Sequence, residues 1–178
     1  MEQEVNVWKS NLTNGLILGL AGIIFTLVTY ALDLTFNKSV PYIFYLLTIV
    51  LLVYFLKSYR KNYLHDSITY GQAVGAGVII FLYYSLISAV FTYILYTVID
   101  PGLTDKMLSF VEEQMAKSGK IPEASLEAVM SFQKKILKPE FMAPMSILSN
   151  MFYGTVISLI VAIFVKKEGN PLIDTPEN

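Results

Sequence analysis

Ionisable side chains are the first candidates for chemistry in this sequence, and they form no recognised catalytic or metal-binding pattern. Three carboxylates, Asp33, Asp100 and Glu140, stand at the ends of long uncharged stretches, where a cation site or an acid and base pair could form. The single histidine, His65, lies beside Asp66, and the chain has no cysteine. Neither a Ser-His-Asp arrangement nor a Cys or His ligand set is available. We therefore expect no catalytic residue, no metal site, no cofactor and no enzymatic activity.

The distribution of charge indicates which elements would position these groups. The 13 basic and 14 acidic residues are absent from four stretches, residues 10–32, 39–56, 67–99 and 141–165. Placing one charge at the centre of a bilayer costs roughly 3 kcal/mol, and about 20 apolar residues suffice to cross it as a helix. The sequence therefore predicts one membrane domain over residues 1–178, with transmembrane helices at about 12–32, 41–56, 70–99 and 141–165.

Composition and net charge exclude several classes of protein. Hydrophobic residues make up 54% of the chain, and the mean hydropathy of +0.55 is high for a soluble domain. The net charge of −1 provides no attractive field for a polyanion. These values exclude a soluble enzyme and a nucleic-acid-binding protein. The partners that they leave are the lipid bilayer, another protein and further copies of the same chain.

The long hydrophilic segment, residues 100–140, is predicted to form two amphipathic helices joined near residues 118–119. In the first helix apolar residues recur every four positions. In the second, acidic residues come first and lysines last, which matches the helix dipole. The fold class that we predict is all-α: a polytopic four-transmembrane-helix bundle with an extramembrane helical hairpin between the third and fourth spans. The candidate interaction surface comprises Leu103, Met107, Val111, Met115, Val129, Phe132 and Ile136.

Small residues recur along one face of the first, third and fourth predicted transmembrane helices. Such spacing lets two helix backbones approach closely. Packing is the interpretation that we favour, and a polar pathway between helices is the alternative. The second helix has few small residues and is expected to face mostly lipid. The candidate packing residues are Gly15, Gly19, Gly22, Gly71, Gly75 and Gly154.

Gln72 and Asn150 are the strongest polar groups at membrane depth. A proton-coupled transporter usually needs a carboxylate, histidine or lysine inside the membrane, and the four predicted spans contain none. We expect both amides to form hydrogen bonds between helices.

Orientation follows from the positive charges. Lys57, Arg60 and Lys61 lie in the second loop, and Lys166 and Lys167 follow the last span. The positive-inside rule therefore places the N- and C-termini in the cytoplasm, and we expect the location to be the inner membrane of a bacterium.

Several short motifs resemble a family of small bacterial four-span membrane proteins known only as a domain of unknown function. The motifs are Tyr70-Gly-Gln-Ala73, Thr92-Tyr-Ile-Leu-Tyr-Thr-Val-Ile-Asp-Pro101, Glu112-Glu-Gln-Met115, Lys138-Pro-Glu-Phe-Met142 and Lys166-Lys-Glu168. The resemblance covers nearly the whole chain. It implies an integral inner-membrane protein with a soluble hairpin before the last helix, and it implies no activity and no catalytic residues.

Two functional hypotheses follow from these patterns. The first is a non-enzymatic assembly or interaction subunit that uses its outward hairpin to contact protein or lipid. The second is a small oligomeric channel or transporter, because four helices without internal charge offer little room for a solute path in a monomer. The sequence indicates neither a reaction nor a substrate.

Overall fold

The computed structural model describes residues 6–118 and 123–168. Within these ranges the secondary structure is helical, apart from one isolated β-bridge. The elements are α1 (Val7–Ala31), α2 (Val40–Tyr63), α3 (Tyr70–Ile94), the π-helical segment η1 (Leu95–Ile99), α4 (Leu103–Ser118), α5 (Glu123–Ile136) and α6 (Pro139–Val165).

Four of these helices are long and apolar enough to cross a membrane: α1, α2, α3 together with η1, and α6. The predicted all-helical, four-span architecture is confirmed. Helix α2 runs to Tyr63, about two turns beyond the expected end near residue 56, because charged residues can leave the hydrocarbon while the backbone stays helical. Helix α1 begins at Val7, where the Asn6 side chain accepts hydrogen bonds from two backbone N–H groups.

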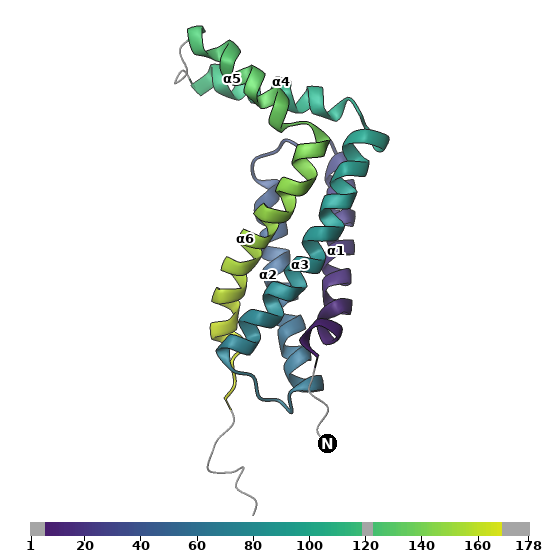
Figure 1. The fold of residues 1–178 in the computed structure, drawn as a ribbon, viewed down its shortest axis with the longest axis vertical. Coiled ribbons are helices and arrows are strands. Elements are labelled where there is room, and N and C mark those ends of the chain that lie inside the picture. The colour runs from purple at the N-terminus through teal and green to yellow at the C-terminus, as the bar shows by residue number, and fades with distance from the viewer. Residues whose placement is uncertain (1–5, 119–122, 169–178) are drawn as a thin grey trace, which may run out of the picture.

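Helix α3 is central to the bundle, since it packs extensively on both α6 and α1 (Figure 1). The bundle has two distinct ends. At the terminal end α1 begins, α6 finishes and residues 64–69 connect α2 to α3; at the hairpin end residues 32–39 connect α1 to α2, and α4 and α5 extend outward. The buried core includes Leu18, Leu52, Phe55, Leu56, Tyr59, Ile68, Ile80, Val161 and Val165. Most of these residues lie in the half of the bundle nearer the terminal end.

A polar clasp closes the terminal end. The Asp66 carboxylate accepts hydrogen bonds from Arg60 Nε at 2.9 Å and from the Lys167 ammonium. Arg60 Nη1 also donates to the Val165 carbonyl at 2.9 Å, and Ile68 and Lys167 exchange two backbone hydrogen bonds of 2.8 and 3.0 Å. The hydrogen bond from Lys167 and the charge of Arg60 lower the pKa of Asp66. The connection from α2 to α3 is thereby tied to the end of α6.

Candidate functional site

Asp100 anchors the hairpin at the end of α3. Its carboxylate accepts a hydrogen bond from the Tyr30 hydroxyl at 3.1 Å and pairs with Lys106 Nζ at 2.8 Å. The lysine, and then the tyrosine hydroxyl, lower the pKa of Asp100. Asp100 therefore joins three elements: α1, the end of α3, and α4. This structural role accounts for its position. No cluster of three acidic or histidine residues suited to a metal ion occurs in residues 6–118 and 123–168.

Helix α4 also rests on the connection between α1 and α2. The rings of Phe36 and Phe110 stack with centroids 5.3 Å apart, and the Lys38 ammonium donates a hydrogen bond to the Gln114 side chain. Near the start of α4, the Tyr96 hydroxyl contacts the Met107 sulfur at 3.6 Å. These contacts hold the first half of the hairpin against the end of the bundle, while α4 and α5 together extend sideways beyond it (Figure 1).

Most of the predicted interaction surface is turned inward. Leu103 is only 2% exposed, so its assignment to an outward surface is wrong: it packs at the base of the hairpin. The half-buried members are Met107, Val111, Met115 and Val129. Phe132 and Ile136 are the exposed members, with 60% and 40% of their surfaces accessible. We call these two residues the α5 edge. Exposed lysines lie near it at positions 134, 135 and 138.

Four of the predicted packing glycines lie where helices touch. A Cβ at Gly154 would overlap the Phe81 ring, and one at Gly15 would overlap the Cβ of Tyr83. At Gly19 it would lie 2.6 Å from Cδ1 of Ile87, and at Gly22 it would lie 2.9 Å from the Tyr84 ring. These positions bring α1 and α6 close to α3. A fifth close approach joins Gly77 of α3 and Ser158 of α6.

Gly71 and Gly75 correct the packing prediction. Both are exposed, and a Cβ at either position would meet nothing within 4 Å. Their spacing is that of a packing motif, but they lie on a face of α3 that no other helix covers in the part of the chain that the structure describes.

The two predicted intramembrane amides have different roles. Gln72 does not bridge helices: its side chain accepts a hydrogen bond from the Thr69 backbone N–H, and the Thr69 hydroxyl accepts one from the backbone of Gln72. This reciprocal pair is a capping box that starts α3. Asn150 does bridge helices, because its Nδ2 lies 3.4 Å from Ser88 Oγ.

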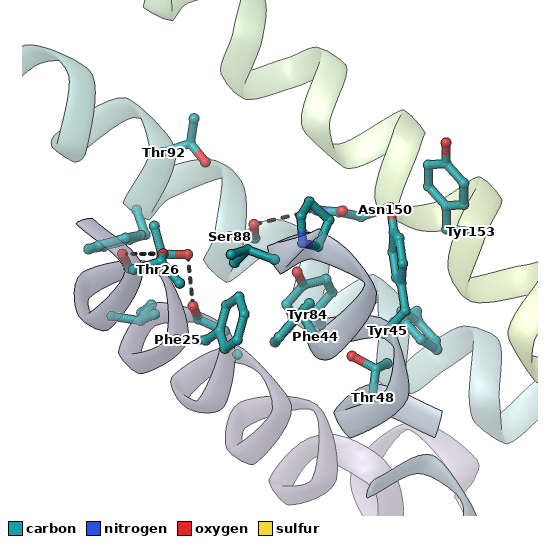
Figure 2. Close-up of a pocket in the computed structure, with 18 of the residues that line it drawn as sticks. Phe25, Thr26, Phe44, Tyr45, Thr48, Tyr84, Ser88, Thr92, Asn150 and Tyr153 are labelled. Atoms are coloured by element: carbon teal, nitrogen blue, oxygen red, sulfur yellow. Dashed lines mark hydrogen bonds between the residues drawn. The ribbon is translucent and has the colours of Figure 1, made fainter. Parts of the chain in front are cut away.

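Asn150 and Ser88 line a cavity of about 290 Å³ among α1, α2, α3 and α6, in the half of the bundle nearer the hairpin end (Figure 2). Residues that carry hydroxyl groups line it from all four helices, among them Thr26, Thr48, Tyr84 and Tyr153. Towards the terminal end the buried apolar core fills the bundle, so residues 6–118 and 123–168 form no continuous polar path along the axis of one chain. The cavity was not predicted, since α2 was expected to face mostly lipid.

Thr48 is the most unusual residue of this cavity. It is 2% exposed, and its hydroxyl has no hydrogen-bond partner among the described residues. Threonines in membrane helices usually satisfy the hydroxyl on a backbone carbonyl one turn earlier, as Thr26 does on Gly22. An unpartnered hydroxyl in such a setting is costly. The signal available in the sequence is that Thr48 is the only serine or threonine in residues 40–56, the uncharged part of α2.

The family model described as "Protein of unknown function (DUF4199)" matches residues 13–167. The chain belongs to this family. The matched region includes all four apolar helices, apart from residues 7–12 of α1, and it includes the hairpin, so the shared unit is the whole bundle described above. Neither the curated proteins nor the solved structures contain a match. The family description states no function and assigns no residue a role, while the four apolar helices indicate a multi-pass membrane protein.

Proposed function

We propose that the protein is a non-enzymatic subunit of a membrane assembly, and that the α5 edge binds its partner. The observation that supports this is the exposure of Phe132 and Ile136 on a hairpin whose other large apolar side chains, where the structure describes them, are at least half covered. Exposed apolar side chains on the spanning helices face lipid, but α5 lies beyond the spans. The α5 edge therefore needs a contact other than the lipid that surrounds the spanning helices.

The setting of the α5 edge favours a protein partner. The hydrogen bonds and ring contacts at Asp100, Phe36 and Lys38 already fix α4 on the bundle. Binding to a surface that is held in place loses less conformational entropy than binding to a free peptide. The neighbouring lysines at positions 134, 135 and 138 favour a partner whose apolar contact patch is bordered by carboxylates.

We further propose that the protein lies in a bacterial inner membrane with both termini in the cytoplasm. Lys57, Arg60, Lys61, Lys166 and Lys167 all lie at the terminal end of the bundle, which supports this orientation under the positive-inside rule. A reporter that is active only outside the cytoplasm should be silent after Asn178 and active when inserted between α4 and α5. The reverse pattern would contradict the orientation.

The partner proposal is tested by replacing Phe132 and Ile136 together with serine in the full-length protein. The expected result is the loss of a stoichiometric co-purifying protein in mild detergent, with unchanged thermal stability of the bundle. A photo-crosslinker at position 132 of the otherwise unchanged protein should capture the same partner. The matched control replaces Glu112 and Ala116, two exposed residues one turn apart on α4, with serine and should retain it.

Other outcomes would contradict the proposal. If position 132 crosslinks only to lipid, the α5 edge rests on the membrane surface. If it crosslinks only to a second copy of the chain, a homo-oligomer replaces the hetero-assembly, and the channel hypothesis gains support.

A further inference from the structure

The cavity between α1, α2, α3 and α6 has features of a ligand site, independently of the α5 edge. It lies at membrane depth, and no acidic, basic or histidine side chain is among the described residues that line it. A charged group placed there would lose its hydration without gaining a counter-charge. The chemistry of the walls therefore selects an uncharged molecule.

The polar groups of the cavity indicate what that molecule must offer. The buried Thr48 hydroxyl can donate and accept, and it has no partner among the described residues. Asn150 uses its amide nitrogen toward Ser88, so its carbonyl oxygen is available to accept. Figure 2 shows Thr48, Tyr84, Ser88 and Asn150 around the same space. A ligand with hydroxyl or carbonyl oxygens would pair with these groups.

Aromatic rings form much of the remaining wall. Phe44 of α2 lies between Phe25, with ring centroids 5.0 Å apart, and Tyr84, at 6.0 Å. Rings at such distances interact favourably in offset or tilted arrangements, and a flat ligand can join them. At the rim, Tyr45 of α2 and Tyr153 of α6 pair at 5.7 Å and remain partly exposed on the outer surface of the bundle. This surface faces lipid, so the site can be reached from the bilayer.

The size of the cavity limits the ligand to a head group. Its volume of about 290 Å³ is just below the range of roughly 300–1,000 Å³ for small-molecule sites. A ring or a glycerol unit fits such a space, whereas a long hydrocarbon tail must remain among the lipids outside the rim.

We propose that this cavity binds the uncharged, oxygen-bearing head of a lipid-soluble molecule, with Thr48 and Asn150 as its hydrogen-bonding residues. Quinones and diacylglycerols share this head-group chemistry, and the aromatic wall favours the flat quinone ring. The site requires one chain only and does not depend on a partner at the α5 edge.

The test measures binding to the full-length protein in lipid nanodiscs. The probes are a benzoquinone with one isoprene unit, dioctanoylglycerol, and dioctanoyl phosphatidylglycerol as the charged counterpart. Thr48→Val keeps the shape of the side chain and removes its hydroxyl. We expect an uncharged probe to bind the wild type and to bind Thr48→Val at least tenfold more weakly. Thr155→Val is the control, because the Thr155 hydroxyl bonds to the Met151 carbonyl at 2.8 Å and does not line the cavity.

The stability of the unliganded variant separates this role from a structural one. Removing an unpartnered buried hydroxyl should leave the melting temperature unchanged or raise it, so weaker binding by Thr48→Val cannot be attributed to unfolding. Preference for the quinone or for the diacylglycerol identifies the source of the head group, and either supports the proposal. Absence of binding by both uncharged probes, equal binding by Thr48→Val, or equal binding of the charged phospholipid would overturn it. None of these results bears on the α5 edge.

Discussion

The two halves of the bundle use the same four helices in different ways. Near the terminal end, Leu52, Phe55 and Leu56 of α2 are buried in a continuous apolar core, and the clasp around Asp66 joins neighbouring segments. Near the hairpin end, the same helix is separated from α1, α3 and α6 by a cavity and contacts them there largely through aromatic rings such as Phe44. The difference indicates that one half holds the bundle together while the other leaves space among its helices.

The strongest test of this difference is a pair of phenylalanines on α2. Phe55→Ala should destabilise the protein by about 2 kcal/mol or more, because it opens a void in a packed core. The hydrophobic transfer contribution is small when the surrounding solvent is lipid, so this value is below the roughly 3–5 kcal/mol that is usual for such a change in a soluble core. Phe44→Ala only enlarges an existing cavity and should cost clearly less. Thermal unfolding in detergent measures both variants, and equal losses would remove the distinction between the two halves.

A second test compares two glycines. Gly154→Ala places a methyl group on the Phe81 ring and should cost about 1–3 kcal/mol, as overpacking usually does. Gly75→Ala meets no neighbour and should be neutral or stabilising by up to about 1 kcal/mol, since alanine favours helix more than glycine does. Unfolding and gel-filtration measurements on both variants check this. If Gly75→Ala changed the oligomeric state, the open face of α3 would be in contact with another chain.

The smallest expected effect concerns the clasp. Asp66→Asn removes the charge that Arg60 and Lys167 share and should lower the melting temperature slightly at neutral pH. Because folding lowers the pKa of Asp66, its contribution is fully present above the pKa of the unfolded chain and is lost as the pH falls through the lower folded value. Wild type and variant should therefore converge in acid. Asp105→Asn, at an exposed residue of α4 with no ion pair in the described parts of the chain, is the control. A difference that persists in acid would contradict this account.

The architecture was predictable because the cost of a buried charge acts on every residue of a span. Uncharged stretches therefore identified all four spanning helices, and helix periodicity identified the hairpin. The direction in which a given face points depends on neighbours distant in the sequence, which explains why Gly71 and Gly154 looked alike although only Gly154 touches another helix.

For some of the predictions that the structure corrects, the local sequence already contained the relevant signal. Thr69 and Gln72 have the spacing of a capping box, which indicates a helix start for the glutamine side chain rather than a bridge between helices. The cavity had no such signal beyond Thr48, because it results from the separation of α2 from its neighbours, and no periodicity within one helix encodes that separation.

The π-helical segment Leu95–Ile99 has a consequence for the direction of the hairpin. The Asp100 N–H bonds to the Leu95 carbonyl five residues earlier, at 2.9 Å, instead of four. The wider turn holds one residue more than an α-helix would, and one residue corresponds to a rotation of about 100° around the axis. Deleting a single residue here would restore the ordinary pitch and rotate Asp100 away from Tyr30. The direction in which the hairpin of α4 and α5 leaves the bundle is therefore set by the one extra residue in this turn.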